Sequence, residues 1–189
     1  AATGIVSVPA GTTAGTYIIT YRLREATTLL NYDDATITIV VVAPAIVAND
    51  DTLTNVNGYV ATNNAIDVLT NDTLNGDATS LSNVKVTVDT PATPINGGPV
   101  PILEPLTGKV NILAGTPAGD YQIKYHICEN LNPTNCNDAT VFITVVGPPI
   151  VAVDDTASNV NGYVGAINVV NALTNDTLNG STLQVSQIN

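Results

Sequence analysis

Short runs in which apolar and polar residues alternate recur along the chain, and turn-forming residues separate them. The clearest are residues 84–88, which read VKVTV, and residues 121–127, where every second residue is Tyr or Ile. Alternation of this kind is typical of strands with one buried face. No stretch keeps an apolar period near 3.6 residues, so the sequence predicts an all-β fold with almost no helix.

Between residues 46 and 146 the strand signals come every 8–15 residues, with turns rich in Pro, Gly and Asn between them. This spacing is typical of an immunoglobulin-like Greek-key β-sandwich. Tyr121 begins one of these strands and Tyr17 stands in the same context, so each is either a tyrosine corner or a half-buried strand tyrosine. The predicted strands are A at 46–49 continuing through 52–56, B at 65–70, C at 81–89, D at 100–103, E at 109–113, F at 121–128 and G at 138–146.

The chain repeats itself with a period of 104 residues. Residues 46–76 and 150–180 carry nearly the same text without a gap, and residues 1–44 match 105–148. About half of about 85 paired positions are identical, which is the mark of a modular array. We expect a segment of a longer tandem protein, with the C-terminal part of one module (strands E–G) at 1–44, a complete module at 45–146 and the N-terminal part of a third (strands A–C) at 147–189.

The linkers between modules are short and contain proline: residues 42–45 read VAPA, and residues 146–149 read VGPP. Proline holds such a linker extended, so the modules are expected to stack end to end as a semi-rigid rod that rises about 40 Å per repeat. In an alternative arrangement, residues 1–44 and 147–189 of different copies complete one another, and the chain polymerises by strand sharing like a pilin.

Charge and composition exclude several classes of function. Five basic residues against 16 acidic ones give a net charge of −11, which disfavours nucleic acid and anionic lipid as partners. The most apolar run, 37–48, contains Pro44 and is shorter than the ~20 residues of a membrane-spanning helix. No nucleophile, base and orienting acid stand at a readable spacing, and there is no phosphate-binding loop. We therefore expect neither an enzyme nor a membrane-inserted protein.

Cys128 and Cys136 flank the loop ENLNPTN in a predicted hairpin. A disulfide across this hairpin is favoured over two free thiols and indicates an oxidising, extracellular setting. Two cysteines and His126 are too few ligands for a closed zinc site. The other copy of the hairpin has Arg24 and Tyr32 at the cysteine positions, so the disulfide is a local staple that the fold does not require.

Acidic residues gather where strand A and the B–C, D–E and F–G loops share one pole of an immunoglobulin-like module. Oxygen-rich clusters at a module junction suit Ca²⁺, whereas the alternative is that these acids cap turns through bonds to the backbone. Most recur in the repeat, although Ser181 replaces Asp77 and Glu104 has no counterpart within the chain. The candidate calcium ligands are Asp50, Asp51, Asp72, Asp77, Glu129, Asp154, Asp155 and Asp176, and no other cofactor is expected.

The same stretches contain weak glycosylation signals. Asn71 and Asn175 begin Asn-Asp-Thr, the N-glycosylation acceptor pattern, with Thr73 and Thr177 as its hydroxyl residues. An acidic residue, a hydroxyl residue and an apolar residue also follow one another at Thr52, Thr73, Thr156 and Thr177, which resembles the O-glycosylation signal of secreted Bacteroidetes proteins.

Several longer phrases resemble the tandem repeats of giant cell-surface adhesins in gliding Bacteroidetes, the SprB-type gliding-motility adhesins. They are VANDDT at 47–52, DVLTNDTLNG at 67–76, TPATPINGGPV at 90–100, AGTPAGDYQIKYHICENLNPTNC at 114–136 and DATVFITV at 138–145. VANDDT is also similar to bacterial cadherin-like repeats. The resemblance implies export by the type IX secretion system, an extracellular location on the bacterial surface, and a role in adhesion or gliding. Its implied partners are neighbouring repeats, the outer-membrane secretion or gliding machinery, and surface polysaccharide.

Together these features predict a stalk segment of an extracellular filamentous adhesin. The alternative of another class is a glycan-binding module, which needs an exposed aromatic platform. Tyr59 and Tyr163, both in an Asn-Gly-Tyr turn, are the candidates for such a platform.

Overall fold

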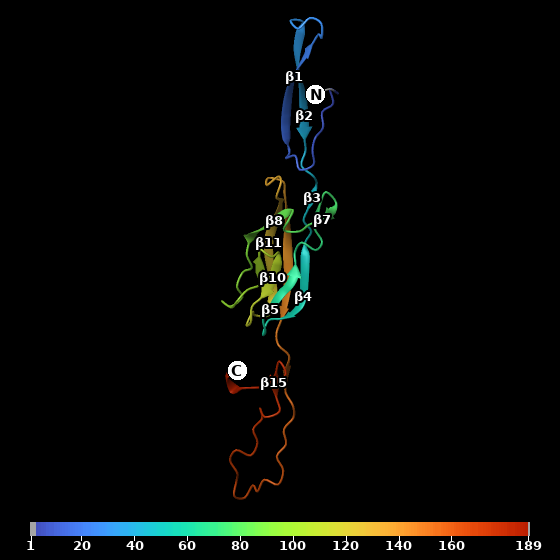
Figure 1. The fold of residues 1–189 in the computed structure, drawn as a ribbon. Coiled ribbons are helices and arrows are strands. Elements are labelled where there is room, and N and C mark those ends of the chain that lie inside the picture. Colours follow the sequence, from blue (N-terminus) through green and yellow to red (C-terminus); the bar gives the residue numbers. More distant parts are fainter. Residues whose placement is uncertain (1–2, 189) are drawn as a thin grey trace.

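The computed structural model describes residues 3–188 and consists of three units that follow one another along a single axis (Figure 1). The first is a long hairpin, the second a complete β-sandwich, and the third a small sheet with an extended loop. Helix within residues 3–188 is limited to the 3-10 turn η1 (Val185–Gln187), so the predicted all-β class is confirmed. No helix in this part of the chain is long and apolar enough to cross a membrane.

The middle unit is an immunoglobulin-like Greek-key sandwich of two sheets. One sheet has the strand order β4-β12-β11-β8, and the other has the order β5-β10-β9. Strand β4 runs parallel to β12, whereas all other neighbours are antiparallel. The strands are β4 (Asp51–Asn57), β5 (Thr62–Asp67), β8 (Val84–Thr90), β9 (Ile102–Glu104), β10 (Lys109–Ile112), β11 (Gly119–Glu129) and β12 (Cys136–Val146).

The core lies between the two sheets and uses the inward residues of the alternating runs. On β11, Tyr121, Ile123, Tyr125 and Ile127 are all buried, and the intervening residues point outward. Val110 and Ile112 of β10 face them from the second sheet and are fully buried. The Tyr121 hydroxyl donates to the Pro117 carbonyl at 2.8 Å, which confirms the tyrosine corner.

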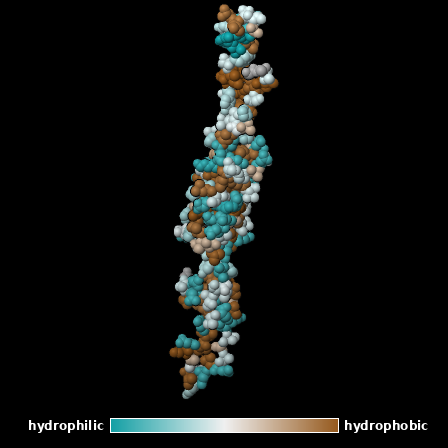
Figure 2. Space-filling model, viewed as in Figure 1, coloured by the Kyte–Doolittle hydropathy of each residue, from teal (hydrophilic) through white to brown (hydrophobic). Residues whose placement is uncertain are grey.

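The first unit repeats the long hairpin of the middle unit in the same register. Its strands β1 (Gly15–Arg24) and β2 (Tyr32–Val41) pair Gly15 with Val41, as β11 and β12 pair Gly119 with Val145. The inward face is open here, because residues 3–44 contain no counterpart of β5 or β9 and the counterpart of β10, residues 5–8, forms no strand. Tyr17 is 38 % exposed where Tyr121 is 3 % exposed. Figure 2 accordingly shows apolar side chains at the surface of this unit. The predicted strand E of residues 1–44 is not formed within residues 3–14, because its sheet partners are lacking.

A small sheet at the entry of the second and third units was predicted only in its first strand, which is the start of predicted strand A. It consists of β3 (Ile46–Val47), β6 (Thr73–Leu74) and β7 (Asp77–Ala78), and it recurs as β13 (Ile150–Val151), β14 (Thr177–Leu178) and β15 (Ser181–Thr182). The turn between β6 and β7 is Asn75-Gly76, with φ of 56° and 84°, a dipeptide that favours tight hairpins. The rest of the third unit forms neither strand B nor strand C, because it has no counterpart of the strands that β5 and β8 pair with.

Local hydrogen bonds correct several predicted strand ends. Strand B ends at Asp67, three residues before the predicted end, because the Asp67 carboxylate accepts the Leu69 N–H at 3.1 Å and turns the chain. Strand C begins at Val84 because the preceding residues form a turn, with the Asn83 N–H bonded to the Ser80 carbonyl. Strand A divides into β3 and β4, which join different sheets, and strand D is shifted to 102–104.

Candidate functional site

The acidic pole of the middle unit lies where β3 leads into β4 and where the chain leaves β5. Asp51 is 5 % exposed and Asp72 is 1 % exposed, so both carboxylates are buried. The Tyr125 hydroxyl lies 2.9 Å from Asp51 Oδ2 and 3.2 Å from the Val68 carbonyl oxygen. The pole therefore joins the first strand of the module to the centre of the core.

Burial controls the charge of these two acids. Loss of water raises the pKa of Asp51 to about 7, against the lowering effect of the Tyr125 hydrogen bond, and the neighbouring Asp72 raises it further. Burial likewise raises the pKa of Asp72 to about 6, against the bond from the Asn49 N–H. A protonated Asp51 can donate to Tyr125, whose hydroxyl then donates to Val68, and this chain satisfies every buried group in it.

Asp72 also fixes the backbone between β3 and β4 through a hydrogen bond. Its Oδ1 accepts the Asn49 N–H at 2.8 Å, and Asp176 accepts the Val153 N–H at the same distance in the third unit. The same contact therefore forms in the complete sandwich of the middle unit and in the third unit, which has no complete sandwich. Asp72 Oδ2 is buried and has no hydrogen-bond partner. This free oxygen is the one feature of the pole that suits a bound cation.

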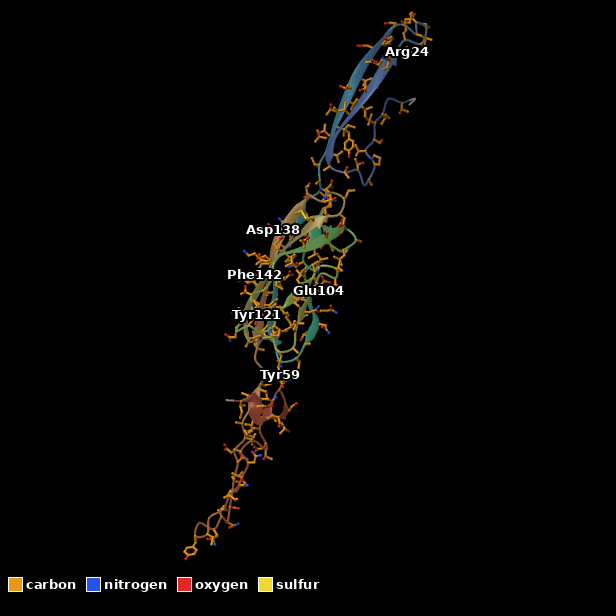
Figure 3. The ribbon with its side chains drawn as sticks, turned by 90° about the vertical axis from the view of Figure 1, so that its left-hand side faces the viewer. Arg24, Tyr59, Glu104, Tyr121, Asp138 and Phe142 are labelled. Carbon is orange, nitrogen blue, oxygen red and sulfur yellow. A yellow bond between two sulfur atoms is a disulfide. The ribbon has the colours of Figure 1, made fainter. Side chains whose placement is uncertain are left out.

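The other predicted calcium ligands do not converge on this pair. Asp50 is exposed and accepts the Thr140 N–H at 2.8 Å, while Asp77 is exposed on β7. Both oxygens of Glu129 are engaged within its own loop. Exposed positions are occupied by Glu104 on β9, which Figure 3 labels, and by Asp154 and Asp155 in the third unit.

Backbone capping, the alternative to calcium, thus accounts for Asp50, Asp72 and Asp176. Calcium binding at the pole stays a prediction. Calorimetric titration of the chelator-treated chain tests it: heat of binding and a rise in melting temperature that an Asp72→Asn variant lacks would support it. An absence of both in the native chain would refute it.

The loop between β11 and β12 is held in shape by a disulfide and by hydrogen bonds among its own residues. Cys128 and Cys136 lie opposite each other and form a disulfide. The buried Glu129 carboxylate accepts from Asn132 Nδ2 at 2.8 Å and from Asn135 Nδ2 at 2.9 Å. These bonds fix two amide side chains at the tip of the unit.

The first unit builds the same loop without a disulfide. Glu25 takes the place of Glu129 and accepts from Asn31 Nδ2 at 2.7 Å, a bond that, with one from Thr27, lowers the pKa of Glu25. At the cysteine positions Arg24 faces Tyr32, with the guanidinium carbon 6.0 Å from the ring centre (Figure 3 labels Arg24). Arg22 lies closer to the same ring, at 4.1 Å. Cation–π contacts therefore stand where the disulfide stands in the middle unit.

The β11–β12 loop of the middle unit forms the junction with the first unit. Asn132 Oδ1 accepts the Ala14 N–H at 2.7 Å, and Asn135 Nδ2 donates to the carbonyl of Pro44 in the linker at 2.9 Å. The next linker carbonyl, of Ala45, accepts the Asn75 N–H at 2.7 Å. The sequence analysis did not identify Asn132 and Asn135 as functional. Their only signal was the density of amide side chains in a loop closed by cysteines.

The opposite end of the middle unit contacts the third unit. Asn57 Nδ2 donates to Asn179 Oδ1 at 2.9 Å, and Gln187 Nε2 donates to the Tyr59 hydroxyl at 3.1 Å. Figure 3 shows Tyr59 at this end of the sandwich. The turn is held by Gly58, where a Cβ would lie 2.0 Å from the Thr116 carbonyl oxygen. Tyr59 therefore takes part in a junction, while the residue stays 41 % exposed and Tyr163 of the third unit is 98 % exposed.

The predicted glycosylation residues divide by exposure. Asn71, Asn175, Thr52 and Thr156 are exposed, whereas Thr73 and Thr177 are half-buried in β6 and β14. Asn71 Nδ2 also donates to the Asp50 carbonyl at 3.1 Å. Nothing in these contacts tests whether any of them is modified.

Comparisons with known proteins add little to this description. No protein-family model matches the sequence, and no curated protein matches it. A solved structure of protocadherin gamma B7, comprising extracellular cadherin domains 1–4, is similar with a TM-score of 0.37 and 9 % sequence identity. The match covers 80 % of this chain and 47 % of that one, so the chain spans about half the length of that structure. At this level the likeness says nothing about function.

Proposed function

We propose that the chain is a stalk segment of an extracellular adhesive filament and that its role is mechanical rather than catalytic. The observation that carries the proposal is the pair of hydrogen-bonded junctions. Each linker is anchored to the unit that follows it, through Asn75 to Ala45 and through Asn179 to Pro149. Side chains at both ends of the complete module also bond to its neighbours. Such contacts favour a stiff array that holds a distal site away from a cell.

The strand order of the sandwich suits a load-bearing element. The first long strand of the module, β4, and its last strand, β12, are parallel neighbours. A pull on the two linkers draws these strands in opposite directions along their length. All the hydrogen bonds between them are then loaded together, in shear, instead of opening one after another.

Force spectroscopy tests the mechanical role. We expect the 189-residue chain, pulled from its two ends, to extend with one dominant unfolding event from the middle unit. A Thr52→Pro variant removes a donor from β4 and should lower the unfolding force. A smooth extension of the native chain without a distinct event would refute a load-bearing sandwich.

A surface location and a role in gliding are the finer parts of the proposal, and they are supported by the resemblance of the repeats to gliding-motility adhesins. Export through the type IX system and contact with outer-membrane machinery follow from the same resemblance. Antibodies against residues 45–146 should label intact cells of the source organism and should slow their movement on surfaces. Labelling only after the cells are broken would contradict the location.

A further inference from the structure

Three metal-ligating side chains meet on the outer face of the four-stranded sheet. Asp89, His126 and Asp138 come from β8, β11 and β12, and one ligand atom of each lies within 4.8 Å of the others. Among residues 3–188 no other three histidine, cysteine or acidic side chains come this close. Figure 3 shows Asp138 at the surface of the sandwich. None of the three belongs to the buried pair Asp51 and Asp72 of the acidic pole, although the exposed Asp50 of that pole lines the same surface pocket.

A β-bulge brings Asp89 to this place. In the pairing of β8 with β11 the register shifts by one residue, and the extra residue on β8 is Asp89. A bulge re-aims a side chain, and bulges are frequent beside functional sites. The Asp89 Oδ1 thereby comes within 2.7 Å of His126 Nδ1, while Asp138 is directly opposite His126 on β12.

The surroundings of the group are acidic. A pocket of about 480 Å³ is lined by Asp50, Asp89 and Asp138, and Lys124 is its one basic residue. Three carboxylates facing one ammonium group leave a negative potential at the surface, which attracts small cations.

In the first unit an arginine neutralises the carboxylate that corresponds to Asp138. Arg22 stands at the position of His126, and Asp34 stands at the position of Asp138. The guanidinium binds the carboxylate through two bonds, Nε to Oδ1 at 2.6 Å and Nη2 to Oδ2 at 2.7 Å. A cationic partner for this carboxylate is therefore part of one copy of the hairpin. The other copy offers an imidazole in its place.

We propose that Asp89, His126 and Asp138 bind a divalent transition-metal ion, for which Zn²⁺ is the probe. An imidazole nitrogen selects Zn²⁺, Ni²⁺ or Cu²⁺ over Ca²⁺ and Mg²⁺, which take oxygen ligands. Bonds of about 2.1 Å place tetrahedral ligand atoms about 3.4 Å apart. Small rotations of the side chains bring three atoms that already lie within 4.8 Å into that arrangement.

Metal binding has a defined chemistry and consequence here. An ion on His126 Nδ1 displaces the hydrogen of the contact with Asp89, which leaves to solvent as a proton, and water completes a coordination shell that is open to solvent. Because the ligands come from three neighbouring strands, the ion cross-links β8, β11 and β12. The site therefore couples the stability of the load-bearing sheet to metal concentration.

The experiment is a titration of the chelator-treated chain with ZnCl₂, followed by calorimetry, melting temperature and NMR. His126 is the sole histidine of the sequence, so its imidazole signals report this site without ambiguity. We expect binding of one ion, a shift of those signals and a higher melting temperature. An excess of Ca²⁺ should not compete.

The matched control is His126→Arg, which recreates the Arg22–Asp34 arrangement on the same hairpin. It should stay folded and bind Zn²⁺ about 100-fold more weakly or worse. Asp138→Asn should weaken binding while leaving the histidine present. The proposal is overturned if the native chain shows no zinc-dependent shift of the imidazole signals, or if His126→Arg binds zinc as tightly as the native chain.

Discussion

The buried Asp51 carboxylate is expected to destabilise the complete module as the pH rises from about 4 to about 7. Its pKa is about 7 in the folded protein against 3.8 for a free side chain, because burial disfavours the ionised form. A folded state with a raised pKa holds its proton more tightly than the unfolded state does. The contribution of Asp51 to stability is therefore fully present below the unfolded pKa of 3.8 and falls as the pH rises to about 7.

The magnitude follows from the two pKa values. A rise from 3.8 to about 7 corresponds to an upper bound of about 4 kcal/mol at 1.36 kcal/mol per pKa unit. We expect about 2 kcal/mol, because relaxation and water entry reduce burial penalties. Asp51→Asn replaces the protonated acid with a neutral group of the same shape, whose amide can donate to Tyr125. The variant should be more stable than the native chain by about 2 kcal/mol at pH 8 and equal to it at pH 4.

Urea unfolding followed by circular dichroism at both pH values measures this difference. Asp77→Asn, on the exposed strand β7, reports the effect of removing one negative charge from the surface. A destabilised Asp51→Asn at pH 8 would refute the reasoning, because it would show that the carboxylate is held by a compensating contact in its ionised form.

Three further predictions concern the packing of the middle unit. Gly58→Ala should lower the free energy of unfolding in urea by about 3 kcal/mol, since its Cβ would lie 2.0 Å from a backbone oxygen. At the repeat-matched Gly162 a Cβ meets nothing within 4 Å, so Gly162→Ala should leave the free energy of unfolding unchanged. Equal losses for the two variants would contradict this packing. Tyr121→Phe loses a hydroxyl bond of 2.8 Å across the β10–β11 turn and should lower stability by about 1 kcal/mol, and an unchanged unfolding midpoint would show that the corner contributes nothing. Reduction of the Cys128–Cys136 disulfide should leave the fold intact but lower its stability by about 2–3 kcal/mol for a separation of eight residues, whereas complete unfolding would contradict its role as a local staple.

The fold was largely readable because alternation reports which face of a strand is buried. Residues 121–127 alternate cleanly, and the structure buries each inward residue that the pattern indicates. The end of strand B was wrong because apolar residues 68–69 continue past the strand. There the Asp67 side chain turns the backbone while Val68 and Leu69 still reach the core. An apolar pattern reports burial and does not by itself report the turn.

Sites proved harder to predict because they depend on register. The candidate calcium ligands were grouped by loop topology, yet the structure distributes their oxygens among separate backbone and side-chain donors. Asp89, His126 and Asp138 were not grouped, since 37 and 12 residues separate them and a bulge brings the first into reach. Periodicity carries no information about a single extra residue in a strand pair.

The most direct test of the stalk proposal is small-angle X-ray scattering of the 189-residue chain. We expect a rod with a rise of about 40 Å per module, whose distance distribution has a narrow peak and a long tail. Asn132→Ala and Asn57→Ala, which each remove a junction bond, should shorten that tail by permitting bending. A compact profile, or a profile of freely jointed units that these variants leave unchanged, would contradict the account.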